Sequence, residues 1–214
     1  METETERKEF ENLLRFKMSP TNTKLAMEAY RMSQYGHKGQ KRQSGEEYFE
    51  HPRAVALILI NEFHIYDHEM IIAALLHDDI EDSFIFGDGE EAFETVKKEF
   101  GERPALLVRS VTKLPCAQEE KAQRDCHFYN NLFIGEIGAK ILKVADRIHN
   151  LRTLKHCDMQ KQDKQLLETS ICVWRIAESI ATERPDVFAA FSEAYQKARE
   201  CFNAFVTGRV LVDV

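Results

Sequence analysis

The chain is patterned throughout with the period of an α-helix. Apolar residues recur at three- and four-residue spacing, and hardly any stretch alternates between polar and apolar positions as a strand would. The pattern predicts helices over residues 5–17, 21–35, 52–63, 67–83, 90–100, 104–114, 118–133, 139–156, 161–181 and 186–206. We therefore expect an all-α fold. A length of 214 residues suits a single domain, residues 1–214, with a full core.

The stretch Met70–Ser83, MIIAALLHDDIEDS, passes from an uninterrupted apolar run to one imidazole and four carboxylates. A helix that is apolar on every side is buried, so its continuation is predicted to carry these polar groups inward. Side chains four positions apart stack on one face, which places His77 above Glu81 and Asp78 above Asp82. So many carboxylates in a poorly solvated site require protons, cations or a metal, and a divalent metal is the simplest account. The alternative is an acidic helix end that frays into solvent.

Residues 36–52, GHKGQKRQSGEEYFEHP, are predicted to form a loop because they contain three glycines. Lys41 and Arg42 contribute to a local cationic patch that could hold a phosphate or stack on a base. A solvated turn is the alternative. His51 precedes Pro52, so we expect its backbone to be extended at the entrance of a helix and its ring to point away from that helix. Taken alone, such a histidine is more often a capping or core residue than a metal ligand.

Residues 139–156, AKILKVADRIHNLRTLKH, are predicted to form a helix with one apolar face. Asp146 lies in this apolar surround, and Asn150 follows one turn later on the same face. An aspartate in that position could simply form a structural salt bridge with Arg147 or Arg152. The helix alone does not distinguish a structural from a functional role.

Composition narrows the classes of partner. The 29 Lys and Arg residues stand against 36 Asp and Glu residues, and the net charge of −7 disfavours binding to a nucleic-acid backbone or an anionic membrane. The five cysteines are odd in number and form no C-x-x-C motif, so reduced thiols are expected. No apolar run reaches the roughly 18 residues of a membrane-spanning helix. We therefore expect a soluble cytoplasmic protein with no nucleic-acid or membrane partner.

Four motifs occur in order along the chain: GHKGQKRQSGEEYFEHP, AALLHDDIEDS, FGERPALLVRSVTKL and ILKVADRIHNLRTL. Together they resemble the HD-domain hydrolases of the RelA/SpoT type, and the resemblance spans roughly residues 25–156. It implies an HD-domain helical bundle that the helices within 160–206 complete. The chain is too short for the synthetase and regulatory regions of the long members, so it looks like a small stand-alone alarmone hydrolase. Such proteins remove the 3′-pyrophosphate from guanosine tetra- and pentaphosphate, (p)ppGpp, leaving GDP or GTP, and typically use manganese.

The resemblance also implies a role for individual residues. The metal ligands fall on four residues from three segments: His51, His77, Asp78 and Asp146. The pair that shapes the attacking water falls on Glu81 and Asp82. The substrate contacts fall on Arg42 at the guanine, on Asn150 and Thr153 at the nucleoside side, and on Lys41, Lys143 and Arg147 at the phosphates. Two imidazoles and two carboxylates suit manganese, iron or zinc better than magnesium. We expect Arg42 to be separable from the metal site by mutation.

Some positions depart from the family pattern, and some alternatives stay open. Asp79 stands where an apolar residue or threonine is expected, and it points about 100° away from Asp78 around a helix, which suits a surface residue or an extra charge beside the site. Glu47 replaces a proline, and Ser83 replaces a threonine. The alternative functions are an HD phosphohydrolase acting on another phosphorylated nucleotide, including the 2′-phosphate of NADPH, and a nucleotide-binding HD protein without turnover. The sequence does not predict the oligomeric state.

Overall fold

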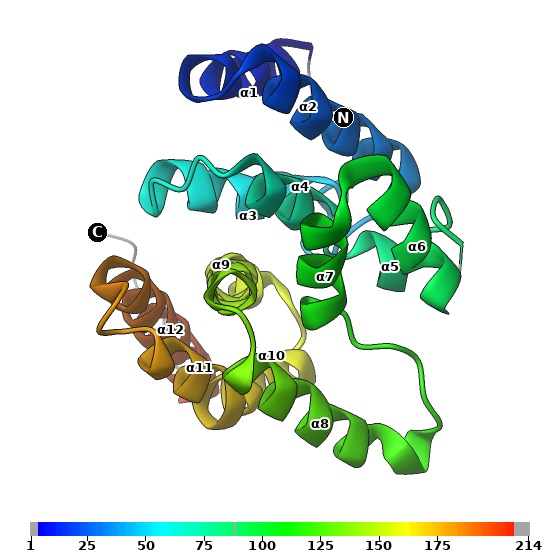
Figure 1. The fold of residues 1–214 in the computed structure, drawn as a ribbon. Helices are drawn as coiled ribbons and strands as arrows, with labels where there is room; N and C mark the ends of the chain where they lie inside the picture. Colours follow the sequence, from blue (N-terminus) through cyan, green and yellow to red (C-terminus); the bar gives the residue numbers. More distant parts are fainter. Residues whose placement is uncertain (1–3, 88, 208–214) are drawn as a thin grey trace.

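A computed structural model describes residues 4–87 and 89–207, and this part of the chain folds into helices (Figure 1). The helices are α1 (Glu4–Lys17), α2 (Pro20–Gly36), α3 (Glu50–Leu57), α4 (His68–Leu76), α5 (Asp79–Asp82), α6 (Gly89–Phe100), α7 (Glu102–Val111), α8 (Lys121–Ile134), α9 (Ile137–Thr153), α10 (Met159–Glu168), α11 (Trp174–Ser179) and α12 (Pro185–Val206). Short helical segments η1 (Ile58–Glu62), η2 (Gln118–Glu120), η3 (Leu154–His156) and η4 (Thr169–Val173) extend or join them. Within the described residues the only extended pairing is an isolated bridge between Lys41 and Glu47. The predicted all-α class is confirmed.

Helix α9 runs through the middle of the molecule and is seen nearly end-on in Figure 1. It contacts α3, α4 and α7 on one side and α11 and α12 on the other. Its buried residues lie on almost all sides of the helix and include Lys143, Asp146 and Arg147. Charged groups are rarely buried without partners, so their position on a central helix indicates a polar site inside the bundle.

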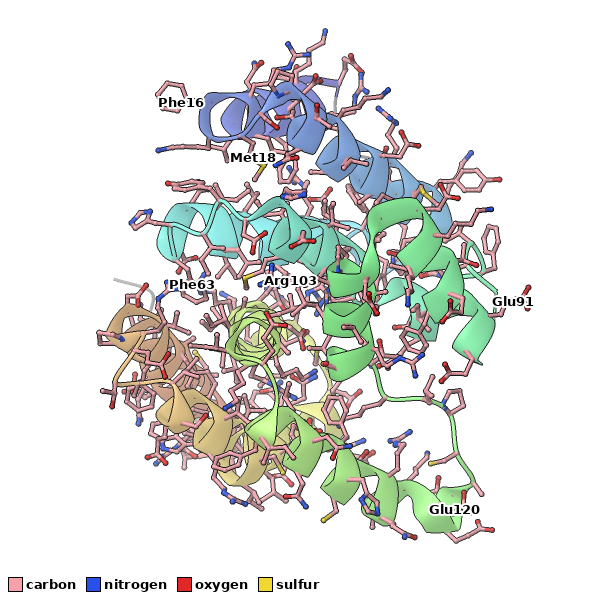
Figure 2. All side chains as sticks on the ribbon, viewed as in Figure 1. Phe16, Met18, Phe63, Glu91, Arg103 and Glu120 are labelled. Carbon is pink, nitrogen blue, oxygen red and sulfur yellow. The ribbon has the colours of Figure 1, made fainter. Side chains whose placement is uncertain are left out.

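Helix α4 is apolar and buried from Met70 to Leu76, as its sequence predicts. Its first turn is fixed by charged contacts. The Asp67 side chain caps the helix by accepting from the backbone N–H of Glu69 at 3.0 Å. Arg103, at the start of α7, donates to Asp67 at 2.5 Å, to Glu69 at 3.0 Å and to Glu136 at 2.8 Å (Figure 2). These contacts tie the beginnings of α4, α7 and α9 together.

Two helix boundaries differ from the prediction, and both affect the site. The helix expected through residue 83 ends at Leu76, and Asp78 starts a new turn in which its carbonyl accepts from the N–H groups of Glu81 and Asp82 at 3.2 and 2.9 Å. The helix expected at Pro52 begins earlier, at Glu50, so the backbone of His51 is helical and not extended. The reason is that proline lacks only an N–H that the first turn of a helix leaves unpaired.

The remaining helices agree with the prediction to within a few residues, and Pro185 does separate the last two. Residues 208–214, for which the sequence made no assignment, lie outside the described residues. No helix in the described part is long and apolar enough to cross a membrane.

Candidate metal and nucleotide site

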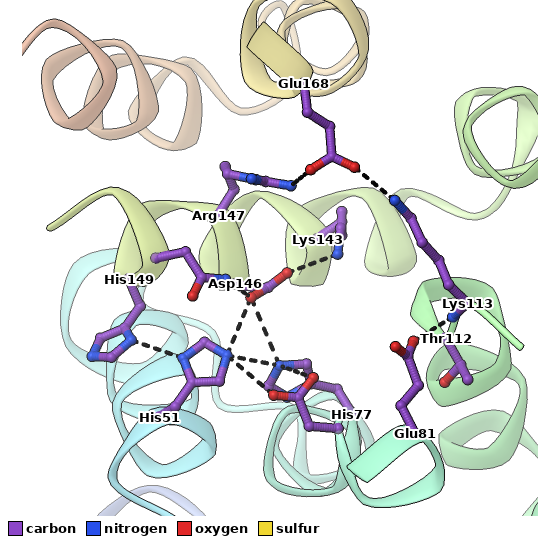
Figure 3. A network of polar contacts seen from close by, with 12 residues as sticks. His51, His77, Glu81, Thr112, Lys113, Lys143, Asp146, Arg147, His149 and Glu168 are labelled. Carbon is purple, nitrogen blue, oxygen red and sulfur yellow. Dashed lines mark hydrogen bonds and ion pairs between the residues drawn. The ribbon is translucent and has the colours of Figure 1, made fainter. Parts of the chain in front are cut away.

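Four predicted ligands converge at the centre of the bundle, and Figure 3 labels three of them, His51, His77 and Asp146. His51 comes from α3, His77 and Asp78 follow α4, and Asp146 comes from α9. The Nε2 atoms of the two histidines lie 3.2 Å apart. His51 Nε2 lies 3.4 Å from Asp78 Oδ2 and 3.2 Å from Asp146 Oδ1, and His77 Nε2 lies 3.2 Å from Asp78 Oδ1. The structure therefore brings together nitrogen and oxygen donors from three segments.

The other ring nitrogens fix which atoms can bind a metal. His77 Nδ1 lies 2.8 Å from the carbonyl oxygen of Ala74, which can only accept, so Nδ1 carries a proton and Nε2 is the nitrogen available to a metal. His51 Nδ1 is occupied by His149 Nδ1 at 2.8 Å. Both Nε2 atoms thus face one another and two carboxylates in a buried space. This donor set fits a divalent metal of the manganese, iron or zinc type.

The electrostatics of the cluster lead to the same conclusion. Burial alone would raise the pKa of Asp146, but Lys143, His51 and His77 hold it well below its usual value. Burial alone would lower the pKa of His77, but Asp78 and Asp146 raise it to about 9. The two aspartates therefore stay ionised and attract positive charge to this point. In a metal-free chain that charge is a proton on His77, with which a divalent metal competes.

Glu81 and Asp82 lie beside the four ligands but make different contacts. The Tyr48 hydroxyl donates to Asp82 Oδ2 at 2.6 Å and lies 3.1 Å from Asp78 Oδ2. Glu81 instead reaches the end of α7, where its carboxylate accepts from the backbone N–H of Lys113 (Figure 3). Burial raises the pKa of Glu81 to about 7, and this hydrogen bond opposes the rise. Glu81 is therefore a carboxyl group able to exchange a proton near neutral pH.

Asp79 is fully buried, so the expectation of a surface residue is wrong. Its Oδ1 lies 3.6 Å from Nε2 of the equally buried His37. The His37 ring stacks on Tyr48 with 4.6 Å between centroids and 19° between planes. Gly36 is packed so closely that an added Cβ would lie 2.8 Å from both Asp79 Oδ1 and Ser83 Oγ. Asp79 thus lies one layer behind the candidate metal ligands and supports the ring of Tyr48 through His37.

A cleft of about 360 Å³ is lined by three of the four predicted ligands, His51, Asp78 and Asp146. Six cationic and four carboxylate side chains line it, so its wall is basic in a chain of net charge −7. The cations are Lys41, Arg42, Lys113, Lys143, Arg147 and Lys161. Such a wall favours an anionic ligand such as a phosphate group.

Internal ion pairs hold three of these cations in place. Lys143 Nζ donates to Asp146 Oδ2 at 2.8 Å. Glu168 accepts from Lys113 Nζ at 2.6 Å and from Arg147 Nη2 at 2.8 Å. The Tyr129 hydroxyl also donates to Glu168, at 2.7 Å. These contacts fix the positions of positive groups around the cleft before any ligand binds.

The loop residue Arg42 reaches across to α9 and does not pair only within its own loop. Its Nη2 donates to Asn150 Oδ1 at 2.6 Å, and its Nη1 lies 3.0 Å from His149 Nδ1. Asn150 in turn donates to Asp146 Oδ1 at 2.5 Å. Thr153 does not line the cleft, and its hydroxyl donates to the carbonyl of His149 at 3.0 Å. Its substrate role stays a prediction.

Four residues with no predicted role make direct contacts in the site: Tyr48, Lys113, His149 and Glu168. Only His149 could have been identified from local sequence, because it lies three positions after Asp146 and therefore on the same face of the helix as Asp146. The other three meet the site only through tertiary packing.

The fold and the donor set define a helical domain with a candidate divalent-metal site at its centre. The HD domain family model matches residues 29–194, so the chain belongs to the HD domain family. This confirms the resemblance drawn from the four motifs.

Two relatives of this chain are named for reactions of guanosine nucleotides. A guanosine-3′,5′-bis(diphosphate) 3′-pyrophosphohydrolase of Aquifex aeolicus is 37% identical over 153 residues, which are 70% of this chain and 20% of that protein. A putative chloroplastic GTP diphosphokinase, RSH1, of rice is 34% identical over 163 residues, 71% of this chain and 18% of that protein. The chain thus spans about a fifth of the length of these relatives.

One solved structure is similar over most of its own length. It is described as a metazoan ortholog of SpoT that hydrolyses ppGpp and has a role in starvation responses. The match has a TM-score of 0.66 and 26% sequence identity, and covers 81% of this chain and 94% of that one.

Proposed function

We propose that this protein is a metal-dependent (p)ppGpp 3′-pyrophosphohydrolase, which converts guanosine tetra- or pentaphosphate to GDP or GTP and pyrophosphate. The observation that carries the proposal is the pair of Nε2 atoms of His51 and His77, 3.2 Å apart, facing two ionised aspartates at the floor of a basic cleft. The Aquifex relative and the metazoan structural neighbour, both named for this hydrolysis, support the choice of substrate.

The four ligands would hold Mn²⁺, for which Fe or Zn are the alternatives by donor type. When bound, the ion supplies Lewis acidity at the phosphoryl group and lowers the pKa of a water molecule. Glu81 then accepts the proton of the attacking water, and Asp82, held by Tyr48, orients that water. The water oxygen forms a bond to the phosphorus next to the ribose 3′-oxygen, the bond between that phosphorus and the 3′-oxygen breaks, and the 3′-oxygen takes up a proton.

The cleft walls would bind the two ends of the nucleotide. Arg42 would stack on the guanine with Asn150 and Thr153 nearby, because a planar guanidinium can stack on a purine and still donate hydrogen bonds. Lys41, Lys143 and Arg147 would contact the phosphates. Lys113 and Lys161 add two further cations to this wall. A cleft of about 360 Å³ suits a small molecule and not a polymer.

We also propose that residues 1–214 act as one domain, since α9 contacts helices from both halves of the chain. We further propose a cytoplasmic location, because five cysteines without disulfide bonds agree with a reducing environment.

A substrate panel tests the proposal. Purified protein with Mn²⁺ is incubated with ppGpp, pppGpp and NADPH, and released pyrophosphate and orthophosphate are measured separately. We expect pyrophosphate from the two alarmones and none from the His77→Ala variant. Orthophosphate from NADPH without pyrophosphate from ppGpp would assign the site to the 2′-phosphate of a dinucleotide. Nucleotide binding without any product would assign the protein to a sensing role.

A further inference from the structure

His149 lies between the candidate metal ligand His51 and the loop residue Arg42. Its Nδ1 atom is 2.8 Å from Nδ1 of His51 and 3.0 Å from Nη1 of Arg42. The two imidazole rings lie with centroids 4.9 Å apart and planes at 41°. Neither the family motifs nor the proposed reaction assigns a role to this side chain. A single nitrogen atom therefore joins a candidate metal ligand to the candidate base-binding arginine.

The proton positions at this nitrogen follow from its two neighbours. His51 needs the lone pair of Nε2 for a metal, so its Nδ1 carries the proton and donates. An arginine nitrogen can only donate. His149 Nδ1 is thus the acceptor for both, and its own proton lies on Nε2.

One imidazole lone pair is shared by the two donors. A hydrogen-bond acceptor behind a metal-bound histidine fixes the tautomer and the ring orientation and makes the ligand more basic. If Arg42 leaves His149 to stack on a purine, the whole lone pair becomes available to the N–H of His51. The ligand nitrogen of His51 is then a better electron donor.

We propose that His149 is a positioning residue that orients His51 for the metal and couples metal binding to the position of Arg42. Metal and nucleotide then each strengthen the binding of the other, because coupling between two sites is reciprocal. This replaces the expectation that Arg42 can be separated from the metal site. The coupling to nucleotide rests on the proposed function, in which Arg42 binds the base. The role of His149 in orienting His51 is independent of the proposed function.

The first test measures Mn²⁺ affinity without nucleotide, from the EPR signal of free Mn²⁺ during titration of the metal-free protein. His149→Ala and His149→Gln should weaken binding about 10- to 100-fold, as loss of such a partner typically does. His149→Asn should bind nearly as wild type, because its amide oxygen can occupy the place of Nδ1, whereas the longer glutamine carries its amide further out. His156→Ala removes an exposed imidazole elsewhere and is the control.

The results separate the inference from the metal site itself. Equal affinities of the Asn and Gln variants, or wild-type affinity of the Ala variant, would overturn the role of His149. Absence of Mn²⁺ binding by the wild type would overturn both this inference and the proposed metal centre. Circular dichroism and the thermal midpoint Tm show which variants are folded, and the comparison of Asn with Gln holds even if His149→Ala does not fold.

The second test addresses the coupling. Arg42→Met removes the donor but keeps an apolar stem, so it should tighten Mn²⁺ binding several-fold. The same substitution in the His149→Gln background should have no effect, because the shared acceptor is gone. Equal effects of Arg42→Met in both backgrounds would show that the coupling does not pass through His149.

Discussion

The Tyr48 hydroxyl donates a hydrogen bond to Asp82 at 2.6 Å and lies 3.1 Å from Asp78, so one phenol bridges a proposed metal ligand and a proposed catalytic carboxylate. Burial, with Asp78 and Asp82, raises the pKa of Tyr48, which keeps its proton in place. The ring itself is held by His37. Asp82 is therefore positioned relative to the metal site by a residue from the loop before α3.

We expect Tyr48→Phe to lower kcat about 10-fold or more with little change in KM. A hydrogen bond to a charged group contributes about 1.5–3 kcal/mol, and about 1.4 kcal/mol corresponds to a factor of ten in rate. Steady-state kinetics with ppGpp provide the measurement. Tyr35→Phe is the matched control, because Tyr35 is exposed and lies outside the cleft. A wild-type kcat for Tyr48→Phe would mean that Asp82 needs no such support.

The pKa of Glu81 predicts a pH dependence. A proton acceptor must be ionised, so the rate should rise with pH as Glu81 loses its proton. The negative charge of Asp78 contributes to the raised pKa of Glu81, and a bound cation offsets that charge. The midpoint of the pH profile should therefore fall between the ordinary value of 4.5 and about 7.

Glu81→Gln tests the same residue directly. It should lower kcat about 10²- to 10⁴-fold, keep metal binding, and lose this step in the pH profile. Glu91→Gln, an exposed change to the same amide, should change neither the rate nor the profile (Figure 2). If the step persists in Glu81→Gln, another group accepts the proton.

Metal removal should abolish turnover and lower stability. Metal that binds only the folded chain stabilises it by about 2.7 kcal/mol at a hundredfold excess over Kd. We therefore expect a chelator to lower Tm and Mn²⁺ to restore both Tm and activity, with no Mn²⁺ effect on Tm in His77→Ala. Full activity after exhaustive chelation would contradict a metal-dependent reaction.

Asp79 predicts a pH dependence of stability. Burial raises its pKa to about 6, against an ordinary value of 3.8, and His37 opposes the rise. A raised carboxyl pKa means that the folded state binds the proton more tightly than the unfolded chain does. This contribution to stability is present below about pH 4 and is lost as the pH rises through 6.

The Asp79→Asn variant should not lose stability in this way as the pH rises. Relative to the variant, the wild type should lose about 2–3 kcal/mol of unfolding free energy between pH 4 and pH 7, since one pKa unit corresponds to about 1.4 kcal/mol. Urea unfolding of both proteins at several pH values gives the difference. A difference that does not change with pH would show that Asp79 has an ordinary pKa in the folded protein.

The sequence was informative where the physical cause is local. The residues next to His77, Asp78 and Asp146 in the sequence are apolar, which predicts buried surroundings for these three. The family motifs then grouped these positions with His51. The structure places the four side chains close together, and their role as ligands stays a prediction. The helical period likewise predicted the all-α fold and most helix positions.

Contacts between distant segments could not be predicted in this way. Tyr48 reaches Asp78 across 30 positions, and Lys113 reaches Glu168 across 55. No periodicity encodes such pairs, because they depend on how the helices pack. The burial of Asp79 was missed for the same reason. A residue about 100° from Asp78 would lie on the surface of an isolated helix. Here the end of α2 and the following His37 cover the side chain of Asp79.

Glu168 accepts hydrogen bonds from both Lys113 and Arg147. A phosphate that binds these cations must take the place of a carboxylate already hydrogen-bonded to them, so its net gain is an exchange of one anion for another. A lone orthophosphate gains little from that exchange. A pyrophosphate group that also contacts Lys143, Lys161 and a metal ion would gain more, so Glu168 would disfavour the binding of simple anions to Lys113 and Arg147.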